Sequence, residues 1–191
     1  MKAAALVLLS SSVLAGGYGQ LPLAFEPNQG QADAQVKYLA RGDGYALFLT
    51  GSGAVLKLGG AVVRMRLAGA NAHARARGLD RLPGKSHYFT GNNPAQWRTN
   101  IAQYARVWFE EVYPGISLVY YGNQRQLEYD FVVAPGADPR RIQLEFEGTE
   151  NVRVDSGGDL VLRTATGEVR QRKPLVLQGQ RVVTGRYVVR M

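Results

Sequence analysis

The sequence predicts an all-β protein, an antiparallel β-sandwich of about a dozen or more short strands. Runs of β-branched and aromatic residues recur along the chain, and turn sequences rich in glycine separate them. Several runs alternate apolar and polar residues, as antiparallel strands with one buried face do. No ten-residue stretch has the apolar stripe of an amphipathic helix, so helical and mixed classes are not favoured.

The first residues have the character of a secretory signal peptide. Lys2 is followed by an uninterrupted small and apolar run over 3–14 and by the small residues Ala15, Gly16, Gly17 and Gly19. The run is short for a bilayer span, so we expect export, removal of residues 1–19, and a single all-β domain over 20–191 without a transmembrane segment. A buried N-terminal strand or helix is the less favoured alternative.

Composition narrows the possible partners. The chain has no cysteine, so neither disulfides nor a lipoprotein anchor are available to it after export. Its formal net charge is +8, but arginine and lysine are interspersed with acidic residues and form no block. We therefore expect no nucleic-acid binding, and a surface polysaccharide or another anionic surface fits this charge better.

The first part of the domain is predicted to be a meander. Residues 20–33 should form an extended segment that turns at Pro27 and Asn28. Short strands separated by glycine-containing turns are then expected over 36–40, 45–50, 54–58 and 62–67.

The next stretch is predicted to be less regular. Asn71–Lys85 lacks an apolar stripe and should be an exposed, mobile loop. A brief strand over 86–90 should lead to one helical turn, with Asn93 as its cap and Pro94 at its first position. A strand over 101–109 should follow.

The segment from 113 to 139 predicts a β-hairpin. Its strands should cover 116–121 and 126–133, with Gly122 and Asn123 in the turn. On the second strand, four apolar residues face one way and three polar residues the other: Leu127, Tyr129, Phe131 and Val133 against Gln126, Glu128 and Asp130.

This alternation limits the length of the hairpin loop. A two-residue loop places Leu118 opposite Leu127, and a four-residue loop places it opposite Tyr129. An odd loop would place Leu118 opposite Glu128, so we predict an even loop.

The C-terminal part continues with short strands. They are expected over 142–147, 152–154, 160–163, 168–171, 175–178 and 181–190, with a turn over 155–158. The apolar alternation runs up to Met191, so we expect the natural protein or domain to continue beyond it.

Four linked motifs resemble a known family. They are FEPNQGQ (25–31), HYFTGNNPAQWRTNI (87–101), VYPGISLVYYGNQRQLEYDFVVAPGADP (112–139) and GDLVLRTATGEVRQRKP (158–174). In this order they resemble an uncharacterised N-terminal domain of bacterial secreted proteins that precedes SBBP-type β-propeller repeats. The resemblance implies an exported, multidomain surface protein and brings no catalytic residues. This chain ends before any propeller repeat, which implies a fragment or an early-terminated relative.

Two carboxylates are candidates for a polysaccharide-acting site. Glu128 and Asp130 lie two apart on one strand, so their carboxyl groups should be about 6.5–7 Å apart, within the range of an inverting glycosidase pair. The plainer interpretation is a solvated strand face whose charges are balanced by arginines such as Arg64, Arg66 or Arg125. Glu145 and Glu147 show the same spacing.

Aromatic side chains are candidates for a sugar-binding platform, because their faces stack on pyranose rings. The candidates are Trp97, Trp108, Tyr113, Tyr120 and Tyr121. Core packing is the plainer interpretation for most of them. Since Tyr120 and Tyr121 are adjacent on a strand, they should point to opposite faces.

Other motifs give weaker indications. His73 and His87 lack the spacing and the partners of a transition-metal site, and no nucleophile elbow is present. The acidic turn over 155–159 could offer oxygens to Ca²⁺, but a hairpin turn explains its glycines and the EF-hand spacing is absent. The basic residues around Arg170 suit an edge strand protected against aggregation.

The sequence therefore favours a non-catalytic extracellular structural or interaction module without a cofactor or metal. Its partner would be a surface polysaccharide or another domain of the same protein. A carbohydrate-binding module is the first alternative and a polysaccharide-acting enzyme the second. The candidate ligand-binding residues are Trp97, Trp108, Tyr120, Tyr121, Glu128 and Asp130.

Overall fold

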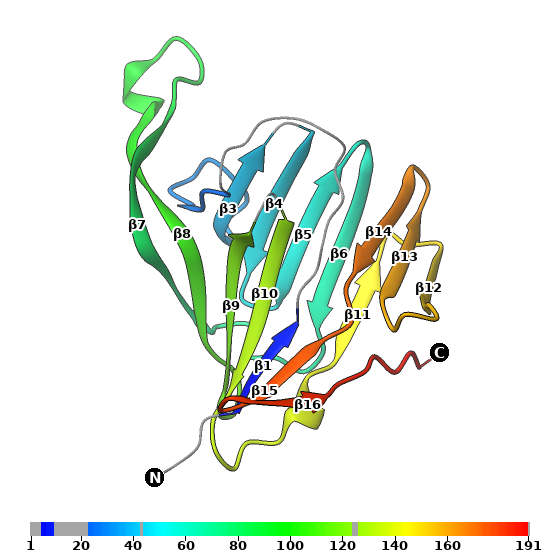
Figure 1. Ribbon diagram of the computed structural model, residues 1–191. Coiled ribbons are helices and arrows are strands. Elements are labelled where there is room, and N and C mark those ends of the chain that lie inside the picture. Colours follow the sequence, from blue (N-terminus) through cyan, green and yellow to red (C-terminus); the bar gives the residue numbers. More distant parts are fainter. Residues whose placement is uncertain (1–4, 10–22, 43, 124–125, 191) are drawn as a thin grey trace.

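The computed structural model confirms the all-β class. It describes residues 5–9, 23–42, 44–123 and 126–190. Their strands form three antiparallel sheets, none of which closes into a barrel (Figure 1). Among these residues, no helix has the length and apolar character needed to cross a membrane.

A seven-stranded sheet and a six-stranded sheet make up the sandwich. The first has the order β16-β15-β1-β10-β9-β8-β7 and the second the order β11-β6-β5-β4-β3-β2. The bounds of the first sheet are β1 Ala5–Leu9, β7 Arg75–Tyr88, β8 Arg98–Tyr113, β9 Ile116–Asn123, β10 Gln126–Val133, β15 Leu175–Gln178 and β16 Arg181–Thr184. Those of the second are β2 Glu26–Pro27, β3 Val36–Gly42, β4 Tyr45–Thr50, β5 Gly53–Leu58, β6 Ala61–Leu67 and β11 Leu144–Glu147.

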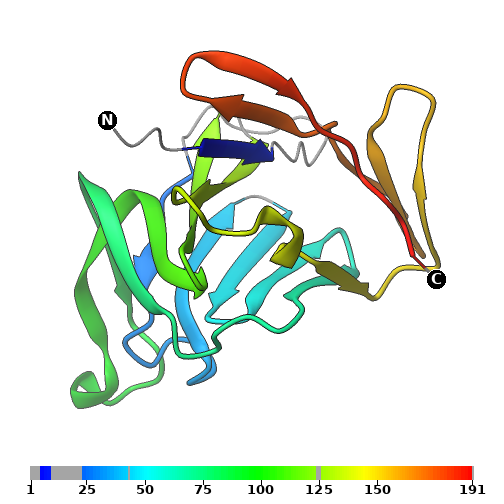
Figure 2. The ribbon, with the colours of Figure 1, turned by 90° about the horizontal axis from the view of Figure 1, so that it is seen from below.

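The main core lies between these two sheets. In Figure 2, strands β3–β6 face strands β7–β10, and the inward residues of both sets are buried. The largest fully buried side chains include Phe25, Phe109, Tyr120, Tyr129 and Phe131. The apolar face predicted for residues 126–133 is therefore a face of this core.

A three-stranded sheet lies to one side and has a small core of its own. It consists of β12 Asn151–Val154, β13 Leu160–Thr164 and β14 Gly167–Gln171. Leu160, Leu162 and Val169 pack there against Val63 of the six-stranded sheet. Two 3-10 turns complete the regular structure: η1 Pro94–Gln96, capped by Asn93 as predicted, and η2 Pro139–Arg141.

The mobile loop predicted over Asn71–Lys85 is wrong. This segment supplies most of β7, which pairs along β8. The segment needs no apolar stripe of its own, because aromatic rings from other strands cover it. A Cβ atom on Gly78 would lie 2.3 Å from the ring of Tyr104, and the Gly78 amide donates to the Tyr38 hydroxyl at 2.7 Å.

The hairpin register also differs from both predicted forms. Leu118 lies opposite Phe131, and Gly122 and Asn123 belong to β9. The pairing of Asn123 with Gln126 leaves an even connection of two residues, 124–125, which lie outside the described residues. The parity argument was correct, but the turn lies two residues further along the chain than predicted.

The last predicted strand, over 181–190, is too long. β16 ends at Thr184 because the following residues turn toward the three-stranded sheet. There the Tyr187 hydroxyl donates to the Arg172 carbonyl at 2.9 Å and accepts from the Gln171 amide at 2.7 Å. These side-chain contacts replace the ladder that the alternating sequence suggested.

Candidate functional site

Four of the six candidate residues lie on one surface, the outer face of β8, β9 and β10. The register places Trp108, Val119 and Asp130 in one row across these strands. The neighbouring row contains Arg106, Tyr121 and Glu128. Directly opposed residues of antiparallel strands share a face, so parity alone brings these side chains together.

The row that contains Asp130 is largely covered. Asp130 is only 7% exposed, and its Oδ1 accepts a hydrogen bond from the Tyr121 hydroxyl at 3.1 Å. Burial raises the pKa of Asp130 to about 6; the Tyr121 hydrogen bond opposes this shift, and the charge of Glu128 adds to it. Burial, followed by the two carboxylates, also raises the pKa of Tyr121, which therefore stays a hydrogen-bond donor at neutral pH.

Glu128 and Asp130 each have a local hydrogen-bond partner. The Asn123 side chain donates to Glu128 Oε1 at 3.2 Å, and the Tyr121 hydroxyl donates to Asp130 Oδ1. Arg64 and Arg66 do not balance these charges as predicted, because they lie on β6 in the other main sheet, and Arg125 lies outside the described residues. Arg66 pairs there with Glu147 at 3.3 Å.

Trp108 is half-buried on the same face. The Arg77 guanidinium lies over its ring, 5.8 Å from the centroid. The indole Nε1 is buried and has no hydrogen-bond partner among the described residues. Because a cation already covers its face, Trp108 is a poor stacking platform for a sugar.

Tyr120 lies on the opposite side of its strand from Tyr121, as expected. It is 0% exposed, and its ring packs against those of Phe109 and Tyr129 at centroid distances of 5.9 and 5.8 Å. A ring in this position belongs to the core and cannot form part of a surface platform. Its hydroxyl group is buried without a hydrogen-bond partner among the described residues.

Replacing Tyr120 by phenylalanine should therefore stabilise the domain. The change removes an unpaired buried hydroxyl, so the free energy of unfolding should rise by about 1 kcal/mol. Tyr187→Phe is the matched control, because it removes two hydrogen bonds and should lower the same quantity by about 1 kcal/mol. Urea unfolding of both variants measures the two changes, and an equal loss in both would contradict the prediction.

The remaining candidate, Trp97, lies far along the β7–β8 hairpin, whose end projects beyond both main sheets (Figure 1). There it meets Phe89, which sequence reasoning missed. Phe89 is 64% exposed and Trp97 38% exposed, and their rings meet edge to face at 5.2 Å. The His87 ring stacks on that of Phe89, with the two centroids 6.0 Å apart. We call His87, Phe89 and Trp97 the aromatic tip.

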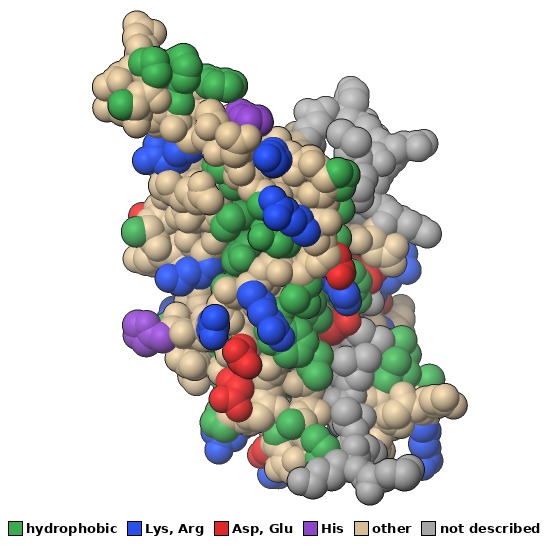
Figure 3. Space-filling view, turned by 90° about the vertical axis from the view of Figure 1, so that its left-hand side faces the viewer, with side chains coloured by type: hydrophobic (Ala, Val, Ile, Leu, Met, Phe, Trp, Pro, Cys, Tyr) green, Lys and Arg blue, Asp and Glu red, His purple; other side chains and the backbone are tan. Residues whose placement is uncertain are grey.

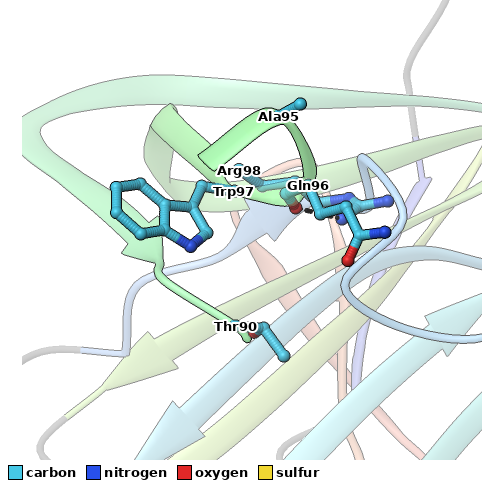
Figure 4. A pocket seen from close by; sticks show the side chains of 5 residues that line it. All are labelled: Thr90, Ala95, Gln96, Trp97 and Arg98. Atoms are coloured by element: carbon cyan, nitrogen blue, oxygen red, sulfur yellow. Dashed lines mark hydrogen bonds between the residues drawn. The ribbon is translucent and has the colours of Figure 1, made fainter. Parts of the chain in front are cut away.

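An open cavity of about 580 Å³ adjoins the aromatic tip. It is lined by Thr90, Ala95, Gln96, Trp97 and Arg98, and Figure 4 shows the indole on one side and the side chains of Gln96 and Arg98 on the other. An apolar ring therefore lies beside hydroxyl, amide and guanidinium groups. This combination offers both stacking and hydrogen bonding to a ligand.

The aromatic tip is held in a fixed arrangement despite its exposure. The Trp97 indole donates to the Gly91 carbonyl at 3.1 Å, and the Trp97 amide donates to the Pro94 carbonyl at 3.1 Å. Arg98 donates to the Gln29 carbonyl at 2.7 Å. A ligand would therefore meet rings whose ordering cost is already met on folding.

The loop that Arg98 contacts is itself ordered by Asn28. The Asn28 side chain donates to the carbonyls of Ala32, Asp33 and Val36 and accepts from the amides of Gly30 and Ala32. FEPNQGQ and HYFTGNNPAQWRTNI are thus joined in space through Arg98. The signal that could have revealed Phe89 is its position two residues after His87, just beyond the end of β7.

The other sequence candidates have partners within the fold. Arg170 forms ion pairs with both Asp155 and Asp159, at 3.3 Å for the second, and lowers the pKa of Asp155. The two carboxylates of the acidic turn are thus already paired with a guanidinium. His87 Nδ1 accepts from the Asn100 amide at 3.4 Å. Within the described part of the chain, no three His, Cys, Asp or Glu side chains are grouped as metal ligands.

These features define a class: an all-β domain with a buried carboxylate on the outer face of one sheet and a projecting aromatic tip. More specifically, the chain belongs to the family described as a domain of unknown function, DUF7948, which matches residues 25–191. The match contains all four motifs but gives no link to β-propeller repeats. No curated protein and no solved structure matches the chain.

Proposed function

We propose that this domain is a non-catalytic extracellular interaction module of a bacterial surface or secreted protein, and that it binds an acidic polysaccharide through the aromatic tip. One observation carries the proposal. Phe89 and Trp97 are exposed, mutually packed and fixed beside a polar cavity, at the end of a hairpin that projects from the body. Large apolar groups in such a position are typical of an interaction site.

The chemistry around the tip favours a sugar. Stacking on Trp97 would engage one face of a pyranose ring, and hydrogen bonding to Thr90, Gln96 and Arg98 would engage its hydroxyl groups. A purely apolar partner would leave these polar groups without new bonds. The leader-like N-terminus and the motif resemblance support export and membership of an SBBP-associated surface protein.

The charge of the hairpin favours an acidic glycan. Four cations on β7 are exposed: Arg75, Arg77, Arg81 and Lys85. Figure 3 shows Lys and Arg side chains spread over this side of the molecule, below the projecting tip. Their attraction for a polyanion would be screened by salt, with a Debye length of about 10 Å at 0.1 M.

Replacing both rings of the tip should weaken this binding strongly. In Phe89→Ser/Trp97→Ser, the affinity for immobilised acidic polysaccharide should fall at least about tenfold, a loss of roughly 1.4 kcal/mol or more. The matched control is Val182→Ser, which removes an equally exposed apolar side chain on β16 and should leave binding unchanged. Depletion assays on both variants at low and high salt would measure the contribution of the rings and that of the cations separately.

Other outcomes would overturn the proposal. If the unaltered domain binds no polysaccharide in a panel of acidic and neutral glycans, a structural spacer fits better. If reducing sugar is released and Asp130→Asn stops the release, the domain is a polysaccharide-acting enzyme of the outer face. Binding that persists in the double variant would place the ligand elsewhere.

A further inference from the structure

Strand β1 has an unusual place in the seven-stranded sheet. It lies between β10 and β15 and is antiparallel to both (Figure 1). Residues 5–9 pair with 129–133 of β10, and residues 5–8 pair with 175–178 of β15. The β15–β16 hairpin therefore joins the rest of the sheet through β1.

The same residues belong to the segment that the sequence assigns to a signal peptide. The family match also starts only at residue 25 and so does not include β1. If export removes residues 1–19, an internal strand of the sheet is lost. This step rests on the proposed export of the protein, but not on glycan binding at the aromatic tip.

Removal of β1 would leave a defined gap rather than an ordinary sheet edge. On one side, β10 would expose the backbone groups of 129–133 that pair with β1. On the other side, β15 stays tied to the body near β10. Gln171 is the last residue of β14, and the chain leads from it into β15. Its buried side chain donates to Tyr129 on β10 and to Tyr187, which follows β16.

The described residues offer no spare strand for this gap. Each strand that the structure describes is already paired in a ladder, so filling the gap from this chain or from a second copy would break existing pairs. A strand from another polypeptide would restore the ladder at no such cost. Addition of a strand at an open β edge is a general mode of peptide recognition.

We propose that the processed domain binds an extended segment of another polypeptide in the position of β1, antiparallel to β10. Its side chains opposite Tyr129, Phe131 and Val133 must be apolar, because these three residues face the core. The position opposite Asp130 lies on the other face and suits a cation. The expected partner is therefore an apolar strand that carries Lys or Arg at one outward position.

The test starts from the folded full chain with a site-specific protease sequence inserted after Gly19. After cleavage, a fluorescent peptide of residues 2–12 serves as the probe. We expect it to exchange into the domain, with saturable anisotropy that the unlabelled peptide competes away. If cleavage unfolds the domain and the peptide restores the fold, the proposal is equally supported.

Three variants of the peptide define the binding mode. Leu8→Lys, opposite Asp130, should bind at least as tightly as the parent peptide. Val7→Lys, opposite Phe131 in the core, should lose at least about tenfold in affinity, and so should Val7→Pro, which cannot complete the ladder. The Leu8→Lys and Val7→Lys peptides have the same net charge and differ in which face of the strand carries the added lysine.

Several results would overturn the proposal. One is a cleaved domain that stays folded, releases the leader and binds no peptide. Another is protection from hydrogen exchange, without peptide, of those amides in 129–133 that point toward β1 and not toward β9, either in a monomer, where the chain itself closes the gap, or in a dimer, where a second copy does. None of these results depends on whether the aromatic tip binds glycans, so the two proposals can fail separately.

Discussion

Phe25→Ala should lower the free energy of unfolding by about 3–5 kcal/mol, because it opens a cavity at the centre of the sandwich. Phe25 is 0% exposed and belongs to the main core cluster. Its backbone amide and carbonyl both bond to Tyr104 at 2.8 Å, which fixes the ring between the two main sheets. For a domain of this size, the melting temperature should fall by roughly 6–20 °C.

The matched control is the same substitution at Phe89. That ring is 64% exposed, so Phe89→Ala should change the free energy of unfolding by no more than about 1 kcal/mol. Urea unfolding of both variants separates the structural ring of the FEPNQGQ motif from the exposed ring of the tip. Equal losses at the two positions would show that Phe25 does not have the packing role described.

The strands with regular alternation could be predicted from the sequence. Tyr45–Thr50 is a strand with the predicted bounds, and Tyr120 and Tyr121 face opposite sides. In these segments one face contacts the core and the other does not, so the local pattern carries the information that the fold uses. Parity likewise sufficed to place Tyr121, Glu128 and Asp130 on one face.

Strand β7 could not be predicted in the same way, because its packing partners lie elsewhere in the chain. The rings of Tyr38 and Tyr104 supply the apolar surface over Gly78, so the strand itself needs no apolar stripe. The aromatic tip was missed for a related reason. Phe89 and Trp97 meet because β7 and β8 pair as far as Tyr88 and Arg98, next to these two rings, and the sequence did not reveal this pairing.

The exposure of the candidate residues also depends on tertiary packing. Sequence spacing places Trp108 on the outer face but says nothing of Arg77, which reaches its ring from the neighbouring strand. It gives Asp130 a polar position but not its burial. Both positions look solvated in the linear pattern, but in the sheet the Asp130 carboxylate is buried and the Trp108 indole is half-buried.

Gly53→Ala should be severely damaging for so small a substitution, with a loss of at least about 3 kcal/mol in the free energy of unfolding. Gly53 has a φ of +147°, which L residues rarely adopt, and it begins β5 after the turn from β4. An added Cβ atom would lie 2.0 Å from the Met65 carbonyl oxygen on β6. That oxygen is part of the backbone of a paired strand, so it cannot move aside without distorting the β5–β6 ladder.

Gly59→Ala separates the effect of the overlap from that of the backbone conformation. Gly59 also has a positive φ, of +52°, but an added Cβ atom would meet nothing within 4 Å. The cost there should be limited to the left-handed conformation, about 1–2 kcal/mol. If the two alanine variants unfold at the same urea concentration, the close approach of β5 and β6 at Gly53 contributes nothing. A difference of about 2 kcal/mol or more would show that the glycine is required by the neighbouring backbone.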